Sequence, residues 1–326
     1  MTNQTTTEFT SVPAVSKRRF SFRTYFPVIL FVVLGAIFGL LSPRFLTGSN
    51  FAIVLQQTVV LLVAALGMTF VIIAGSIDLS VGSIVAIAAL VAASLSDSWG
   101  IAAIAPAMLV GLLAGLLNGL IFAKGKVPSF MVTLGTMVAY RGIVLYFTRG
   151  APVEITNLGF LRTYSGRTAD IPHAAIIAFV VAIIAFIIFN YTVFGREVRA
   201  VGGGERVALL TGIKVDRVKI LVFTLSGLLC GLAGLLQSAR VFAATSQLGQ
   251  GLELDVIAAV VVGGTPLTGG VGSIQGTVLG ALIITILSNG MNMLGVDPYV
   301  QNIVKGVVLV AAVFVTIDRK KIGIIK

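Results

Sequence analysis

Charged residues are scarce in this chain. They make up 11% of its 326 residues, whereas hydrophobic residues make up 57%, and the mean hydropathy is +1.06. A soluble domain usually carries about a quarter charged residues, so this composition excludes an ordinary soluble protein and indicates a bilayer. The net charge of +11 does not indicate nucleic-acid binding, because the cations lie mostly between apolar runs, as they do in the cytoplasmic loops of membrane proteins.

Groups that carry chemistry are also rare, since the chain has one cysteine and one histidine. Cys230 lies inside an apolar run and cannot form an intrachain disulfide, so we expect a small core residue. His173 has no Cys or His companions, which makes a metal site improbable. The chain has no G-x-x-x-x-G-K-[ST] phosphate loop and no spacing that suggests a nucleophile with its base. We therefore expect no cofactor, no metal and no enzymatic activity, including ATP hydrolysis.

Ten apolar runs are candidates for membrane-spanning helices, which need about 20 mainly apolar residues. The third and eighth are short and interrupted by glycine, so eight spans with two half-inserted segments is an alternative. We predict an all-α integral membrane protein with a disordered cytoplasmic tail at 1–22, a transmembrane domain at 23–318 and a second cytoplasmic tail at 319–326. The ten runs are approximately 25–42, 51–74, 80–96, 99–123, 128–148, 171–194, 219–238, 253–267, 272–295 and 299–317.

The cations are distributed unevenly over the loops between these runs. If the N-terminus is inside, the inner loops and tails hold 16 cations and the outer loops hold five. Because cytoplasmic loops accumulate Lys and Arg, we predict that both termini and the loop at 195–219 are cytoplasmic. The largest outer connection, 150–170, is either a rim for docking a binding protein or a solvated loop.

The stretch from Thr192 to Ile220 is the longest strongly charged interruption of the apolar pattern, with six cations. A short helix from Glu205 to Thr211 is expected in its middle, because Gly202-Gly203-Gly204 and Gly212 flank it and glycine permits sharp turns. This layout is typical of a cytoplasmic loop that presents a small helix to a soluble partner.

Two similar breaks interrupt the apolar pattern. One is V-I-I-A-G-S-I-D-L-S-V-G-S-I at 71–84, and the other is V-V-V-G-G-T-P-L-T-G-G-V-G-S-I at 260–274. Glycine- or proline-interrupted segments in two halves of a chain point to a transport pathway. Since both breaks have the same orientation in the predicted topology, we infer no inverted repeat.

Polar residues within or beside the spans are candidates for the pathway or its gate, because such groups are costly in a membrane and usually face a cavity or a partner. For any single amide, hydrogen bonding between helices is the stronger expectation and substrate contact the alternative. Asp78 or Ser80 is expected to cap the third span, with gating second. Lys305 either pairs with an acid of another span or extends to the surface. The candidates are Gln56, Gln57, Asp78, Ser80, Asn118, Glu253, Asp255, Asn289 and Asn292.

Small residues recur at four-residue spacing, at Gly111, Gly115 and Gly119 and at Gly227 and Gly231. Such faces let helix backbones approach closely, which predicts a compact bundle and a dimer.

Several motifs, in order along about residues 25–318, resemble the permease subunits of bacterial ribose-type sugar ABC importers. They are L-Q-Q-T at 55–58, G-M-T-F-V-I-I-A-G-S-I-D-L-S-V-G-S at 67–83, A-K-G-K-V at 123–127, F-G-R-E-V-R-A-V-G-G-G-E-R-V-A-L-L-T-G-I at 194–213, E-L-D-V-I-A-A-V-V-V-G-G-T at 253–265, N-G-M-N-M-L-G-V at 289–296 and Y-V-Q-N-I-V-K-G at 299–306.

The resemblance implies a type II ABC importer-like permease in the bacterial inner membrane that works by alternating access. It also implies three partners: an ATPase subunit on the cytoplasmic face, a periplasmic or lipid-anchored sugar-binding protein, and a second permease copy, identical or paralogous. The helix around Glu205–Thr211 would be the coupling helix. The residues assigned to coupling are Arg196, Arg199, Gly202, Gly203, Glu205, Arg206, Ala208 and Gly212.

The competing hypothesis is a free-standing carrier coupled to protons or ions, with Asp78, Glu253 or Asp255 as the coupling acid. The charged, glycine-framed loop favours the ABC hypothesis, because a carrier does not need such a loop. The cargo is expected to be a monosaccharide or a related small polyol.

Overall fold

The computed structural model describes residues 22–316, most of which are helical. The predicted tails at 1–22 and 319–326 lie outside this range, except for Phe22. In chain order the helices are α1 (Phe22–Leu41), α2 (Gly48–Ile73), α3 (Val81–Trp99), η1 (Gly100–Ala103), α4 (Ile104–Gly125), α5 (Ser129–Thr148), α6 (Leu158–Tyr164), α7 (His173–Tyr191), α8 (Val193–Gly203), α9 (Glu205–Leu210), α10 (Val215–Val241), α11 (Leu252–Val262), α12 (Ile274–Met293) and α13 (Pro298–Thr316).

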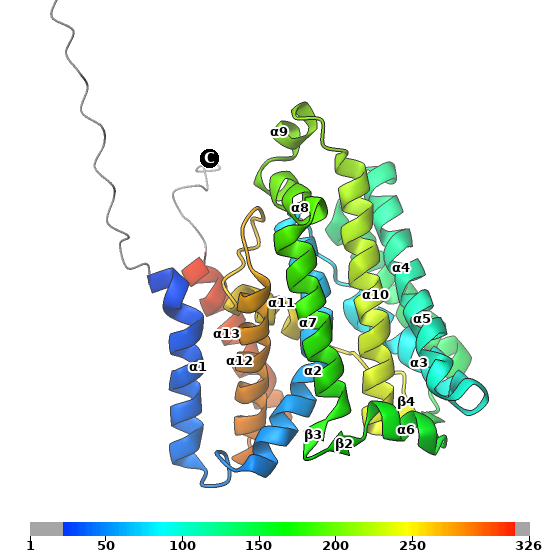
Figure 1. Cartoon of the computed structure of the whole chain (residues 1–326), viewed down its shortest axis with the longest axis vertical. Helices are drawn as coiled ribbons and strands as arrows, with labels where there is room; N and C mark the ends of the chain where they lie inside the picture. The colour runs from blue at the N-terminus through cyan, green and yellow to red at the C-terminus, as the bar shows by residue number, and fades with distance from the viewer. Residues whose placement is uncertain (1–21, 317–326) are drawn as a thin grey trace, which may run out of the picture.

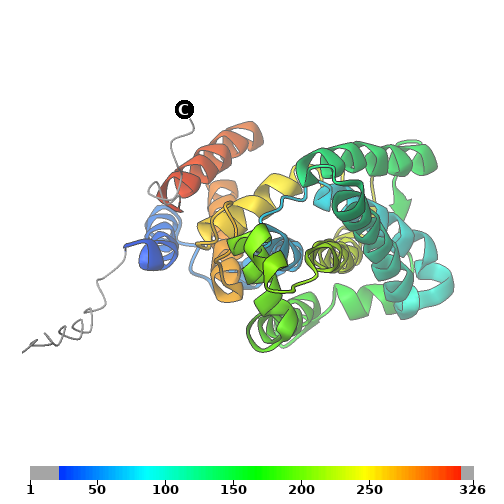
Figure 2. The ribbon, with the colours of Figure 1, turned by 90° about the horizontal axis from the view of Figure 1, so that it is seen from above.

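The long helices form one bundle with two distinct ends (Figure 1). The α9 end carries α8 and α9, and the α6 end carries α6 with the strands β2 and β3. Seen from above, α1 and α13 lie at one edge of the bundle and α4 and α5 at the opposite edge (Figure 2). Four short strands form two antiparallel pairs: β1 (Val153–Glu154) with β4 (Ala243–Ala244), and β2 (Arg167–Thr168) with β3 (Ile171–Pro172).

Local signals fix where several helices begin. The hydroxyl of Thr47 accepts a hydrogen bond from the Asn50 N–H at the start of α2, and Ser273 does the same for Gly276 at the start of α12. Such side chains satisfy amides that have no partner within the helix. Pro298 opens α13, a position at which its missing N–H costs nothing.

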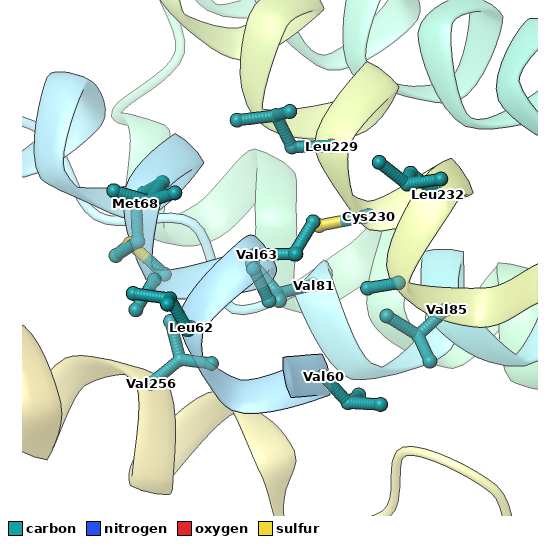
Figure 3. Close-up of a cluster of buried hydrophobic side chains, with 14 of the residues drawn as sticks. Val60, Leu62, Val63, Met68, Val81, Val85, Leu229, Cys230, Leu232 and Val256 are labelled. Carbon is teal, nitrogen blue, oxygen red and sulfur yellow. The ribbon is translucent and has the colours of Figure 1, made fainter. Parts of the chain in front are cut away.

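The core is built around α2, most of which is buried. Val63 of α2 lies beside Val81 of α3 and Cys230 of α10 (Figure 3), and Val60 and Met68 belong to the same apolar cluster. Cys230 is buried, as predicted. By contrast, α5, α7 and α13 expose most of their apolar surface, as expected of helices that contact lipid in a bilayer.

The predicted runs and the observed helices agree in order and approximate position. Among the described residues, seven helical stretches are long and apolar enough to cross a membrane, and one of them, 81–125, contains both α3 and α4. The run predicted at 253–267 is too long, because α11 ends at Val262. Its 11 residues rise about 16 Å, roughly half of a bilayer core. The number of crossings stays a prediction.

The glycine spacings are used inside one chain. A Cβ atom added at Gly111 of α4 would lie 2.7 Å from the Cα of Gly231 in α10, and one at Gly115 would lie 2.9 Å from the Cα of Gly227. The two backbones therefore touch where only glycine fits. The α4–α10 interface occupies these faces, so a second copy cannot pack against them. The glycine spacing therefore no longer supports the predicted dimer.

The connection at 150–170 is packed rather than fully solvated. Phe160 and Tyr164 of α6 are buried, and the Tyr164 hydroxyl donates a hydrogen bond to the Ile101 carbonyl in η1. Burial raises the pKa of this phenol. The pairing of β1 with β4 ties the connection to the segment that follows α10.

Candidate functional site

The loop between α7 and α10 forms two helices at the α9 end of the bundle. The predicted helix at Glu205–Thr211 is present as α9, which ends one residue earlier, at Leu210. It exposes three apolar side chains, Val207, Leu209 and Leu210, with relative exposures of 66, 64 and 81%. An apolar patch of this kind on a polar loop marks an interaction surface.

Three of the predicted coupling residues make contacts that hold the loop together. Ala208 is the buried residue of α9. The Arg199 guanidinium lies 4.7 Å from the centre of the Phe189 ring and donates a hydrogen bond to the Phe189 carbonyl, which fixes α8 against α7. The Glu205 carboxylate accepts a hydrogen bond of 2.7 Å from Lys219 and so ties α9 to α10.

Other predicted coupling residues are exposed at the same end: Arg196, Gly203, Arg206 and Gly212. Gly212 has φ +86°, the left-handed conformation that glycine adopts without strain. Gly202 differs from the others, because it packs against Ile73 at the end of α2. Participation of any of these residues in coupling stays a prediction.

A polar network lies at the centre of the bundle, where the break after α2 leads into α3. The Ser80 hydroxyl donates to Asp78 at 2.6 Å, the Ser226 hydroxyl donates to the same carboxylate at 3.2 Å, and the Asn118 amide donates to Ser80 at 2.7 Å. The Tyr140 hydroxyl donates to the Asn118 carbonyl oxygen at 3.3 Å. Asp78, Ser80, Asn118 and Ser226 are completely buried, so the network joins α3, α4, α5 and α10.

Of the two residues predicted to cap the third span, Ser80 does not do so. Ser80 occupies the N-cap position, but its side chain makes no capping hydrogen bond. The reason is its backbone, which already has helical angles (φ −80°, ψ −7°), whereas a capping residue is typically extended. Asp78 instead accepts a hydrogen bond from the N–H of Ser80.

A cavity of about 330 Å³ lies nearer the α6 end, between α2, α3, α10, α11 and α12. Of the predicted pathway residues it brings together Gln57, Asp255 and Asn292. Several further polar side chains line it: Gln237, Arg240, Gln250, Thr285 and Ser288. Most of these are uncharged groups that both donate and accept hydrogen bonds, which is the chemistry that holds a polyhydroxylated ligand.

A second cavity of about 720 Å³ lies beside the first and shares Gln250 and Asp255 with it. Lys305 of α13 lines this second cavity and donates a hydrogen bond of 2.8 Å to Asp255. Both side chains are mostly buried, with exposures of 22 and 27%. Of the two alternatives for Lys305, the structure therefore shows pairing with an acid.

The remaining predicted pathway residues lie apart from the cavities. The Asn289 carbonyl oxygen accepts a hydrogen bond from Asn50, which joins α12 to α2. Gln56 accepts one from Arg167 at the surface. Glu253 lies next to Gly82, at the start of α3. These contacts join elements of the bundle, as expected for most membrane amides.

Tyr140 and Ser226 of the buried network escaped the sequence-based prediction, because neither residue type is unusual in an apolar helix. Arg141 donates to the carbonyls of Ser246 and Leu248, each at 2.7 Å, and holds the segment before α11. Its charge within a span was the available signal. Among the described residues, no group of three or more His, Cys, Asp or Glu could hold a metal ion.

Residues 50–313 match the family described as branched-chain amino acid transport system, permease component. The chain belongs to this permease family. Its curated relatives include the ribose import permease protein of Escherichia coli (strain K12), which is 44% identical over 303 residues, or 90% of this chain and 93% of the relative. The ribose import permease protein of Bacillus subtilis (strain 168) is 42% identical over 299 residues, covering 90 and 92%.

The xylose transport system permease protein of Escherichia coli (strain K12) is 34% identical over 364 residues, covering 90% of this permease and 92% of the relative. No solved structure matches the permease. These relatives confirm the predicted resemblance to permease subunits of ribose-type ABC importers. They favour an ABC permease over a free-standing carrier.

Proposed function

We propose that this permease moves a monosaccharide or a related small polyol across the bacterial inner membrane, as the membrane subunit of an ABC importer. The relatives named above are named for ribose and xylose. The cavity lined by Gln57, Gln237 and Asn292 supports the same class of cargo. A site rich in amides and hydroxyls rejects an apolar ligand, because its buried polar groups would be left without partners.

The observation that carries the proposal is the exposed apolar surface of α9 among cationic side chains. Val207, Leu209 and Leu210 project from the α9 end, and Arg196 and Arg206 are exposed on the same loop. Apolar anchors within a polar rim are typical of a protein interface. The ATPase subunit binds here, so the α9 end is cytoplasmic, in agreement with the distribution of cations.

The sugar enters from the opposite side. A sugar-binding protein docks at the α6 end and delivers its ligand toward the cavity. Val63, Leu66 and Ile84 are buried in the core, and we propose that this packing separates the cavity from the α9 end until the ATPase acts. Closure of the ATPase subunits tilts the helices of two permease copies and opens the pathway toward the cytoplasm.

Transport into proteoliposomes tests the proposal. The permease is reconstituted with its ATPase subunit and a sugar-binding protein, and uptake of radiolabelled ribose and xylose is measured. We expect uptake that requires ATP and the binding protein and that persists when a protonophore collapses the proton gradient. Uptake that needs the proton gradient and proceeds without ATP would instead establish the carrier, with Asp78 as the first candidate for the coupling acid.

A further inference from the structure

Three backbone segments that are distant in sequence meet at the α9 end. They are the end of α2 with its break (Ile73–Gly75), the end of α8 (Gly202–Gly203) and the break between α11 and α12 (Gly269–Gly270). The Gly270 N–H donates a hydrogen bond of 2.8 Å to the Ile73 carbonyl. We refer to these residues as the glycine junction.

The contacts within the junction are as close as backbones can approach. A Cβ atom at Gly202 would overlap the Ile73 carbonyl oxygen and lie 2.6 Å from the Gly270 nitrogen. One at Gly270 would lie 2.9 Å from the Cα of Gly203. Gly270 also has φ +79°, which side chains disfavour by about 1–2 kcal/mol. No side chain fits at Gly202 or at Gly270. Because the three backbones are in direct contact, pushing one of these segments toward the others displaces them as well.

Each segment leads to a functional part of the permease. The chain continues from Gly203 directly into α9. From Gly75 the first break runs to Asp78 and the buried network. From Gly269 the second break runs back to α11, which carries Asp255 on the wall of both cavities.

One polar atom in the second break lacks a partner. The Thr265 hydroxyl is buried and forms no hydrogen bond with the protein, and no other buried side-chain oxygen or nitrogen of the described residues is in this position. It lies close to Gly272. A buried hydroxyl without a protein partner adds nothing to the stability of this break.

We infer that the glycine junction couples α9 to both helix breaks, so that Gly202 and Gly270 position the transport pathway according to the state of the ATPase. The inference rests on the proposed binding of an ATPase at α9. When the ATPase moves α9, the end of α8 presses on Ile73 and on the second break together. The movement thereby reaches α3 and α11 and changes access to the cavity.

The test compares two helical glycines. Gly202→Ala places a methyl group against the Ile73 carbonyl, whereas Gly135→Ala, in α5 and outside the junction, points its methyl group into open space and serves as the control. Each is combined with Gln57→Cys, which puts a thiol in the cavity. The native Cys230 is fully buried and stays in place. Labelling by a membrane-impermeant maleimide is measured in nanodiscs with the ATPase bound, without nucleotide and after trapping with ATP and vanadate.

With Gly202 intact, we expect trapping to change the labelling rate at least fivefold. We expect Gly135→Ala to keep this change and Gly202→Ala to reduce it below twofold while the ATPase stays bound. A full change in labelling with Gly202→Ala would overturn the role of the junction and leave the importer intact. No change with the intact junction would refute alternating access itself, and this inference with it.

Gly202→Ala can fail to fold, so the unsubstituted complex supplies a second measurement. Hydrogen–deuterium exchange is followed with and without ATP and vanadate. We expect trapping to change amide exchange in α9, residues 74–80 and residues 263–273 together. A change confined to α9 would overturn the inference.

Discussion

Asp78 offers a prediction that separates a structural carboxylate from one that couples transport to protons. Three donors point at it: the N–H and the hydroxyl of Ser80, and the hydroxyl of Ser226. Asp78→Ala leaves all three buried without their acceptor. At about 1–3 kcal/mol for each unsatisfied group, the loss is roughly 3–9 kcal/mol, against a typical total stability of about 5–15 kcal/mol.

Asp78→Asn keeps nearly the same shape and most of the hydrogen bonds. Its carbonyl oxygen accepts both bonds from Ser80, and its NH₂ group donates to Ser226. We therefore expect Asp78→Asn to lie within about 1 kcal/mol of the unsubstituted permease, with unchanged ATP-dependent uptake. Asp97→Ala, on the exposed end of α3, is the control. It removes one exposed hydrogen bond from Thr156, for which water can substitute, so the expected loss is less than about 1 kcal/mol.

The chain carries its own reporter for the assay. Cys230 is the single cysteine and is fully buried, so a thiol-reactive dye becomes fluorescent only on unfolding. We expect melting temperatures close together for the unsubstituted permease, Asp78→Asn and Asp97→Ala, and a much lower one for Asp78→Ala. Equal destabilisation by Asn and Ala would refute the hydrogen-bond argument. A stable Asp78→Asn variant without uptake would show that the carboxylic acid itself is needed for transport.

Three further predictions use the same melting assay. Gly111→Ala should destabilise the permease by about 1–3 kcal/mol through overpacking at α10. Gly135→Ala, whose methyl group meets open space, should leave the melting temperature nearly unchanged. Equal melting temperatures for the two variants would contradict the close contact between α4 and α10. Lys305→Met should destabilise the permease more than the double variant Lys305→Met/Asp255→Asn does, because the single change leaves a mostly buried carboxylate without its partner. If the destabilisation by the double variant equals the sum of the two single changes, the pair does not contribute. Glu205→Gln removes the charge of a carboxylate that is 59% exposed and paired with Lys219, which is 13% exposed. The amide oxygen of glutamine can still accept the hydrogen bond from Lys219, so stability should fall by only about 1 kcal/mol while the affinity for the ATPase, measured by titration, falls more. Equal small effects on both would remove Glu205 from the interface.

The sequence predicted the helices well because the signals that define them are local. Apolar runs mark the spans, and residues such as Thr47 and Ser273 mark where helices begin. The α9 helix was predictable for the same reason, since Gly202–Gly204 and Gly212 frame it.

The sites were less predictable, because they depend on contacts between residues far apart in the chain. The spacing of glycines showed that Gly111 and Gly227 permit close packing, but not that these helices pack against each other within one chain. Nor could it show that Asp255 meets Lys305 or that Gly202 reaches Ile73. Apolar pattern alone also overestimated the length of α11, because the turn at Gly263–Gly264 continues the small-residue composition of the helix.

We propose that this permease passes the state of an ATPase through α9. The most direct test measures ATP hydrolysis by the ATPase subunit, co-purified with the permease in lipid nanodiscs, with and without sugar-loaded binding protein. We predict that the binding protein stimulates hydrolysis, and that the stimulation disappears when Glu205 and Arg206 are replaced by alanine although the permease stays folded. Undiminished stimulation in that variant, or the absence of a stable ATPase partner, would contradict the account.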